Sequence, residues 1–306
     1  MARYILLRVL GLIAVLLIVS VITFVLMHEV PGGPWQYGER PFTDQQLTAL
    51  KKLYGLDKPL IEQYFSWLRG VLRLDFGRSF QYPDRSVTAL IRDTWPTTLH
   101  LGLMTILVAF GLGLPLGIIA ALKQNTWIDY LTTLLSVLGY VTPHFVWAIL
   151  FILVFSLTFK WFPTGGWDSP RNWVMPVMAY ALAPMAVIAR YTRSSVLDVV
   201  RQDYVRTARA KGLRENTVVF RHMMKNAMIP MITVFAPLIP DLITGSIFIE
   251  AIFRVPGLGR YWVTSTVARD YPMIIGMTVL WSVLIAVTYL LTDILYVLVD
   301  PRVTYT

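Results

Sequence analysis

Long runs of uncharged, mostly apolar residues alternate along the chain with shorter charged stretches. About 20 apolar residues in a helix cross a hydrocarbon core, and six runs reach or approach that length. They are Val9–Met27 and the runs within Thr97–Leu122, Tyr130–Phe159, Trp173–Ala189, Ala227–Ile249 and Tyr271–Leu298. The pattern predicts an all-α, polytopic membrane protein with six transmembrane helices. Five spans would instead place the two termini on opposite sides.

The first run and two prolines refine this prediction. Val9–Met27 follows two arginines and has no small-x-small cleavage site before the turn at Pro31-Gly32-Gly33-Pro34, so we expect a retained signal anchor rather than a cleaved signal peptide. The second and third runs are longer than a bilayer requires. We therefore expect them to tilt or to project beyond it, with kinks at Pro115 and Pro143.

Composition and charge agree with a membrane protein. Hydrophobic residues make up 56% of the chain and charged residues 15%, and the chain has no cysteine for disulfides or thiol chemistry. The segment Arg190–Lys225, here called the basic loop, holds nine Lys/Arg and three acids, so it supplies six of the net charge of +9. This concentration indicates membrane topology rather than nucleic-acid binding.

Positive residues in short loops predict the orientation. With six spans they all fall on one side, which should be the cytoplasm, so both termini should be cytoplasmic. These residues are Arg3, Arg8, Lys123, those of the basic loop and Arg302.

Three regions follow from this topology. We predict an N-terminal transmembrane anchor at residues 1–27, an extracytoplasmic cap at 28–95, and a five-helix core at 96–306 with a cytoplasmic loop at 190–226. Helical periodicity in Leu60–Leu74 favours an ordered cap over a solvated connector, because long structureless loops are uncommon in compact proteins.

The basic loop has its own helical pattern. Ser195 and Asp198 form an S-x-x-D capping pattern, and a stripe of Val196, Val199, Val200, Tyr204 and Ala208 predicts an amphipathic helix. Gly212 should end it in a left-handed turn, after which Leu213–Lys225 can start a second helix. The alternative is that the charges only enforce orientation and contact anionic lipid. That alternative explains neither the small residues nor the glycine.

These residues resemble the inner-membrane permease subunits of binding-protein-dependent ABC importers, in the dipeptide/oligopeptide branch. The resemblance covers nearly the whole chain. It is carried by Asp203-Tyr204-Val205-Arg206-Thr207-Ala208-Arg209-Ala210-Lys211-Gly212, Phe220-Arg221-His222, Asn226-Ala227, Tyr54-Gly55-Leu56-Asp57-Lys58-Pro59, Gln63-Tyr64, Asp75-Phe76-Gly77-Arg78-Ser79, Pro96-Thr97-Thr98-Leu99, Glu250, Phe253, Pro256-Gly257-Leu258-Gly259, Arg269-Asp270-Tyr271-Pro272 and Asp300-Pro301-Arg302.

The chain also departs from the general importer pattern, which is Glu-Ala-Ala, three residues and Gly. Arg206 and Thr207 replace the first two positions, and only Ala208 and Gly212 match. Lys225 stands where many relatives have proline. These departures look like those of the peptide branch, but they put any fixed contact of a glutamate in doubt.

The resemblance implies a permease subunit that forms half of the pathway for di- or oligopeptides in a bacterial or archaeal plasma (inner) membrane. Its expected partners are a second homologous permease, two ATPase subunits, an extracytoplasmic substrate-binding protein and membrane lipid. The chain itself should be no enzyme and should bind no cofactor, with ATP and Mg held by the ATPases. No G-x-x-x-x-G-K-[ST] loop occurs, and the glycines of Gly111-Leu112-Gly113-Leu114-Pro115-Leu116-Gly117 should serve helix packing.

Candidate site residues follow from the resemblance and from isolated charges. The residues expected to couple to the ATPase are Tyr204, Arg206, Ala208, Arg209, Lys211, Gly212, Leu213, Arg221 and His222; those expected to meet the binding protein are Arg254, Pro256, Gly257 and Arg260. Asp241, inside the fifth span after Pro240, either lines the pathway or bonds backbone freed by that proline. No second ligand accompanies the histidines at metal spacing, so we expect no metal site.

Two questions stay open at this point. A proton-coupled secondary transporter of small solutes is the alternative function, although we detect no inverted repeat. An intramembrane enzyme would need a nucleophile and a base together, and no such set stands out. For the cargo, peptides lead, with nickel chelates, glutathione and sugars as alternatives.

Overall fold

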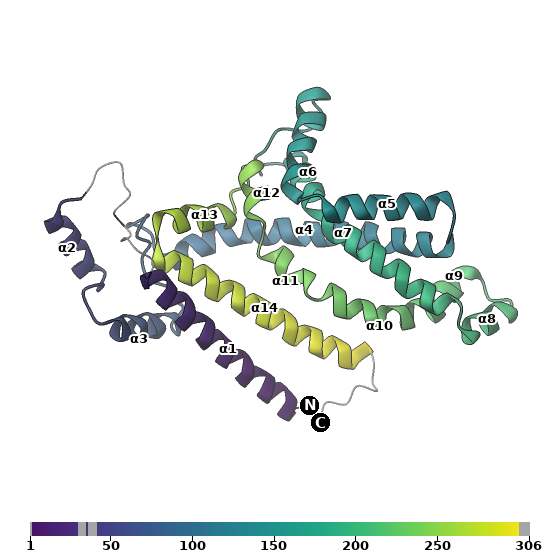
Figure 1. Ribbon diagram of the computed structural model, residues 1–306, viewed down its shortest axis with the longest axis horizontal. Coiled ribbons are helices and arrows are strands. Elements are labelled where there is room, and N and C mark those ends of the chain that lie inside the picture. Colours follow the sequence, from purple (N-terminus) through teal and green to yellow (C-terminus); the bar gives the residue numbers. More distant parts are fainter. Residues whose placement is uncertain (1, 30–34, 36–41, 300–306) are drawn as a thin grey trace. The chain divides into compact units, whose positions relative to one another are not determined.

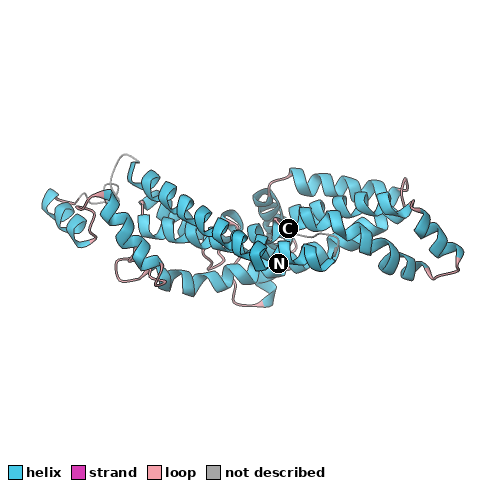
Figure 2. Cartoon of the chain, turned by 90° about the horizontal axis from the view of Figure 1, so that it is seen from below, coloured by secondary structure: helices cyan, strands magenta, loops and turns pink. Residues whose placement is uncertain are grey.

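The computed structural model describes the backbone of residues 2–29, 35 and 42–299. This part is helical apart from turns and one isolated β-bridge between Arg78 and Ser86 (Figure 2). The predicted turn at Pro31-Gly32-Gly33-Pro34 and the motif Asp300-Pro301-Arg302 lie outside the described residues.

The helices follow in order along the chain (Figure 1). They are α1 (Ala2–Glu29), α2 (Asp44–Leu53), α3 (Leu60–Val71), α4 (Val87–Leu122), α5 (Trp127–Val141), α6 (His144–Phe151), the π-helical η1 (Ile152–Thr158), α7 (Pro170–Val200), α8 (Asp203–Ala210), α9 (Glu215–Thr217), the π-helical η2 (Val218–Met223), α10 (Met224–Phe235), α11 (Leu238–Ile243), α12 (Ile247–Ile252), α13 (Gly259–Ala268) and α14 (Tyr271–Val299).

Five stretches are long and apolar enough to cross a membrane, and a bent pair of helices makes a sixth. The five are Leu6–Glu29, Val87–Leu122, Pro170–Val200, Pro230–Ile252 and Tyr271–Asp293. All six predicted apolar runs are thus found in helices. The helix predicted within Leu60–Leu74 is also observed, as α3.

Two of the spans are interrupted. The bent pair, Trp127–Val141 with His144–Thr158, turns by 103° at Thr142 and Pro143, as expected where proline restricts the residue before it. By contrast, α4 continues unbroken through Pro115. The fifth span is divided into α10, α11 and α12, and Gly245 in the last break has a φ of +88°.

The chain divides into two compact units. The first comprises residues 1–97 and 257–286, and the second comprises 98–256 and 287–306. In the first unit, one buried cluster gathers Val87 and Leu90 of α4 around Met273 and Met277 of α14. A second cluster there places Phe24 of α1 among aromatic rings from α3, the α3–α4 loop and α14.

The core of the second unit lies around α7. Glycines allow two other helices to approach it: a Cβ on Gly113 or Gly117 of α4 would lie 2.9 Å or 2.5 Å from an α7 carbonyl oxygen, and one on Gly139 of α5 would lie 3.1 Å from another. The predicted packing role is confirmed for Gly113 and Gly117. A Cβ on Gly111 would meet nothing within 4 Å, so that glycine allows no close approach of another helix among the described residues of this chain.

Candidate coupling segment and neighbouring polar sites

The basic loop begins as a continuation of a transmembrane helix. The fourth apolar run was expected to end at Ala189, but α7 continues to Val200, and the chain breaks at Arg201 and Gln202 before α8. The predicted capping pattern is wrong, because Ser195 lies inside α7 and is only 8% exposed. Packing of this turn against neighbouring helices overrides the local capping signal.

Gly212 ends α8 with the left-handed turn that the sequence predicts. Its φ is +75°, and its N–H donates to the Arg209 carbonyl at 2.9 Å. The Leu213 N–H reaches back to the Ala208 carbonyl at 3.4 Å. These two bonds form a Schellman motif, in which a residue without a Cβ is favoured at the left-handed position. The chain then reverses and enters α9, so the predicted pair of helices joined at Gly212 is observed.

One face of α8 is buried. Val205 is 0% exposed and Ala208 is 5% exposed, and both pack in a core cluster with Val196 of α7 and with Val219 and Met223 of η2. The apolar stripe predicted from the sequence correctly includes Ala208. It places Tyr204 on the buried face, although Tyr204 is exposed, and it omits the buried Val205. The break at Arg201 and Gln202 changes the helical register, so one continuous stripe could not find this face. Ala208 therefore holds α8 by packing against the core of the second unit.

The opposite face of α8 carries charged groups. Arg206 lies 3.7 Å from Asp203, and Arg209 donates two hydrogen bonds to Glu215, at 3.2 Å from Nε and 2.6 Å from Nη2. These bonds hold the pKa of the Glu215 carboxyl below its usual value and raise the pKa of Arg209. The other expected residues on this loop divide by exposure: Tyr204, Lys211, Gly212, Leu213 and Arg221 are exposed, and His222 is half-buried.

Tyr204 ties the two arms of the loop together. The Asn226 amide Nδ2 donates a hydrogen bond of 2.8 Å to the Tyr204 hydroxyl, across 22 residues of sequence. The turn at Gly212, the Arg209–Glu215 pair and this contact hold α8 against the start of α10. The loop therefore presents a formed, basic surface rather than a flexible tether.

Asp241 lies at the interruption of the fifth span. Its carbonyl accepts hydrogen bonds from the Tyr180 hydroxyl at 3.1 Å and the Thr244 hydroxyl at 2.9 Å. Among the described residues, none forms a hydrogen bond or ion pair with its carboxylate, which is exposed on this chain. The interruptions of two spans meet beside it, where Ser246 Oγ lies 3.0 Å from His144 Nε2.

The four residues expected to meet a binding protein fall in two units. Arg254 and Pro256 are exposed in the second unit, where Arg254 has a φ of +54° and donates to the Thr164 hydroxyl at 3.2 Å. Gly257 and Arg260 belong to the first unit. There Gly257 is buried, and Arg260 is exposed and lies over the Tyr261 ring at 5.2 Å.

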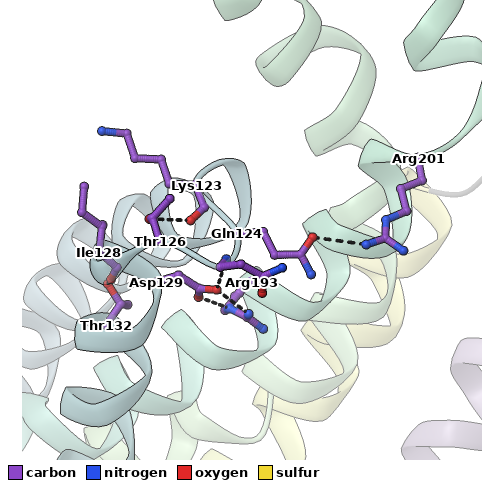
Figure 3. Close-up of polar contacts among 9 residues, drawn as sticks. Lys123, Gln124, Thr126, Ile128, Asp129, Thr132, Arg193 and Arg201 are labelled. Atoms are coloured by element: carbon purple, nitrogen blue, oxygen red, sulfur yellow. Dashed lines mark hydrogen bonds and ion pairs between the residues drawn. The ribbon is translucent and has the colours of Figure 1, made fainter.

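A buried ion pair joins the start of the basic loop to α5, and it has no counterpart in the sequence predictions. Asp129, in the first turn of α5, is 1% exposed and accepts hydrogen bonds from Arg193 of α7, at 2.5 Å from Nε and 2.7 Å from Nη2 (Figure 3). The available signal was that Asp129 directly precedes the apolar run within Tyr130–Phe159 and is the one acid between Trp127 and Phe159. A charge at such a place calls for a partner.

A second buried acid orders the first unit. Asp270 is 0% exposed and accepts hydrogen bonds from the Ser79 hydroxyl, from the Phe80 N–H at 3.0 Å and from the Gln81 N–H at 3.3 Å. It also caps α14 through the Met273 N–H at 3.4 Å. Two of the motifs noted in the sequence, 75–79 and 269–272, are thus brought together at one carboxylate.

Comparison with known proteins identifies relatives along the whole chain. Residues 113–305 match the family described as binding-protein-dependent transport system inner membrane component, and residues 1–102 match the N-terminal family of such membrane components. The chain is 43% identical over 303 residues to the dipeptide transport system permease protein DppB of Bacillus subtilis (strain 168), covering 99% of this chain and 98% of that protein. It is 40% identical to the oligopeptide transport system permease protein AppB of the same strain, covering 100% of both.

A third relative and a solved structure extend the comparison. The chain is 38% identical to the oligopeptide transport system permease protein OppB of Salmonella typhimurium, again covering 100% of both chains. A chain of the MetNI methionine ABC transporter, solved in inward-facing conformations, matches with a TM-score of 0.54 and 16% identity. It covers 69% of this chain and 96% of that one. At this identity the match supports the fold alone.

Proposed function

The chain belongs to the family of binding-protein-dependent transport system inner membrane components, and we propose that it forms half of the translocation pathway of an ATP-driven importer of di- or oligopeptides. The observation that carries the peptide substrate is its full-length similarity to permeases whose names specify dipeptide or oligopeptide transport. The chain is a multi-pass protein of the inner membrane, and its family supports the ATP-driven function over a proton-coupled one.

The basic loop is proposed to face the cytoplasm and to dock on an ATPase subunit. Its excess of positive charge supports this orientation, with both termini on the same side. Its exposed side chains, including Arg206, Lys211 and Leu213, offer a contact surface, whereas Ala208 and Val205 hold α8 to the membrane helices. The absence of a glutamate at position 206 is compatible with this role, because Arg206 points a 73% exposed side chain away from the core.

ATP and Mg are proposed to lie on two partner ATPases, whose closure displaces α8. A second, homologous permease would complete the pathway. Asp241 is proposed to face this pathway, because a carboxylate at an interrupted span with no hydrogen bond or ion pair among the described residues is costly in lipid but tolerable beside water. Arg254, Pro256, Gly257 and Arg260 are proposed to meet the substrate-binding protein on the opposite side, where residues 28–95 would form a cap. The proposed regions are those predicted from the sequence: 1–27, 28–95 and 96–306.

Co-purification and transport test this function. The chain is expressed with candidate ATPase and second-permease subunits, reconstituted in liposomes and supplied with the binding protein and labelled peptides. We expect ATPase subunits to co-purify and peptide uptake to require ATP and to persist when a protonophore collapses the proton gradient. Uptake by the chain alone on a proton gradient would contradict the proposal. Competition by nickel chelates, glutathione or sugars, but not by peptides, would contradict the peptide substrate alone.

A further inference from the structure

The turn between α4 and α5 is fastened twice to the end of α7. Asp129, just after this turn, pairs with Arg193 of α7, and Gln124 Oε1 within the turn accepts a hydrogen bond of 3.2 Å from Arg201 Nη2 (Figure 3). The Asn125 N–H adds a third bond to Asp129, at 3.0 Å. Asn125 has a φ of +62°, so the residue that donates this bond is in the left-handed conformation.

The first of these contacts is geometrically specific. A guanidinium that donates two parallel hydrogen bonds to one carboxylate fixes both the distance and the relative orientation of the two groups. The Asp129 side chain is 2% exposed and that of Arg193 is 28% exposed, so water screens the pair little. A buried carboxylate is costly without its partner, and this holds the two helices together at that point.

The position of the pair along α7 matters for transmitting force. α7 contains internal prolines at 176 and 184, and proline removes a backbone hydrogen bond and makes a helix easier to bend. Arg193 lies between Pro184 and the start of α8 at Asp203. A displacement of α8 is either passed along α7 or absorbed by bending at Pro184, and contacts of α7 beyond Pro184 oppose that bending. The two polar contacts add a connection to α5 and the α4–α5 turn, besides the packing of α4 against α7 at Gly113 and Gly117.

We propose that the Asp129–Arg193 pair, with the Gln124–Arg201 contact, is a brace that makes the α4–α5 turn and α8 move as one body. The proposal rests on the proposed coupling function of the basic loop. Displacement of α8 is then transmitted to α5, which leads to the bend before His144, instead of being absorbed by bending of α7. Asp129 and Arg193 are positioning residues, since neither takes part in the docking surface itself.

A distance measurement tests the brace directly. The natural chain has no cysteine, so Lys123→Cys in the α4–α5 turn and Gln202→Cys before α8 give two specific sites for spin labels. Both positions are exposed. In the complete complex we expect one narrow distance distribution, the same without nucleotide and with trapped ATP. Adding Asp129→Asn should broaden it or make it depend on nucleotide. A state-dependent distance without Asp129→Asn, or an unchanged narrow one with it, would overturn the proposal.

A transport measurement provides the functional test. In reconstituted complexes, Asp129→Asn should lower the peptide imported per ATP hydrolysed by roughly 5-fold or more, the range of typical coupling between two sites. Co-purification of the ATPase subunits should be unchanged. The matched control is Asp93→Asn, which breaks the exposed Arg85–Asp93 pair of the first unit and should leave the ratio at the wild-type value. A wild-type ratio in Asp129→Asn would also overturn the brace.

Two further outcomes are informative. If Asp129→Asn does not assemble, the chain with Asp129 intact provides the test. A spin-label distance that is the same with and without nucleotide supports the brace, and a distance that changes with nucleotide overturns it. If the complex with Asp129 intact shows no ATP-dependent uptake at all, the proposed function fails rather than the brace. If the wild-type complex imports peptide with ATP and the Asp129→Asn complex does so equally well, the brace fails while the proposed function stands.

Discussion

Two arginine–carboxylate pairs of similar chemistry occupy different surroundings in the second unit. Asp129–Arg193 joins two helices with the acid almost fully buried, whereas Arg209–Glu215 spans the Gly212 turn with side chains 39% and 53% exposed. Because Asp129 is buried, removing its cation leaves a charge that water cannot solvate. Because Arg209 and Glu215 are exposed, water can take over the hydrogen bonds that either side chain loses. For stability, the exposed pair on the proposed docking surface should therefore tolerate substitution, whereas the buried pair that joins α5 to α7 should not.

The largest effect is expected from breaking the buried pair. Arg193→Ala leaves the Asp129 carboxylate without its cation, which should lower the free energy of unfolding by about 3 kcal/mol or more. Denaturant unfolding in detergent measures this loss. Arg85→Ala is the matched control, because its pair with Asp93 is exposed, and its loss should stay below about 1 kcal/mol. Equal losses in the two variants would remove the distinction drawn from burial.

Asp270 is a buried acid that neutral donors satisfy, so its loss shows the effect of burial without that of an opposite charge. Asp270→Ala leaves the Ser79 hydroxyl and the Phe80 N–H without their acceptor, which should cost about 2 to 3 kcal/mol. Proteolysis within the 72–86 loop, compared between the variant and the wild type, measures the loosening. Asp75→Ala, which removes an acceptor of the Gly77 N–H, serves as an exposed control in the same loop. Protection of the loop equal to wild type in Asp270→Ala would contradict the assigned role.

Gly212 gives an intermediate effect through the backbone. A Cβ there would meet nothing within 4 Å, so Gly212→Val should destabilise by strain at φ +75°, about 1 to 2 kcal/mol, and not by a clash. Gly212→Asn is the control, because asparagine tolerates the left-handed conformation. Hydrogen exchange of the 203–213 amides measures the fraying. Indistinguishable exchange in Val and Asn variants would exclude backbone strain as the cause.

The smallest effect belongs to the exposed pair. Glu215→Gln should cost about 0.5 kcal/mol, less at high salt. Because the folded-state pKa of Glu215 lies below its unfolded value, the pair stabilises the fold above the ordinary glutamate pKa of about 4.3. This stabilisation is lost as pH falls through the folded-state value. Denaturant unfolding of the wild type and of Glu215→Gln across this pH window measures the stabilisation. A loss as large as that of Arg193→Ala would contradict the claim that the buried pair contributes more than the exposed one.

Elements set by local chemistry were predictable from the sequence. The apolar runs gave the spans, proline gave the break before His144, and Gly212 gave the end of α8. The extension of α7 to Val200 was not predictable, because Ser195 imitates a helix cap and only packing of Val196 shows otherwise. Which glycine of 111–117 packs against α7 also depends on the neighbouring helix.

Contacts between distant residues could not be found from local patterns. Asp129 and Arg193 are separated by 64 residues, and Ser79 and Asp270 by 191. The lone acid at 129 signalled the need for a partner without naming it. Asp241 carries the same kind of signal, and among the described residues its carboxylate has a charge interaction with His144 but no hydrogen bond or ion pair.

The ratio of peptide imported to ATP hydrolysed tests most directly whether the segment around Gly212 couples this permease to its ATPases. It is measured in proteoliposomes holding the complete complex, with wild type, Gly212→Val and Gly212→Asn compared at equal ATPase content. We predict that Gly212→Val lowers the ratio by roughly 5-fold or more while hydrolysis continues, and that Gly212→Asn stays near wild type. A wild-type ratio in Gly212→Val would contradict the proposal that the segment around Gly212 couples hydrolysis to transport.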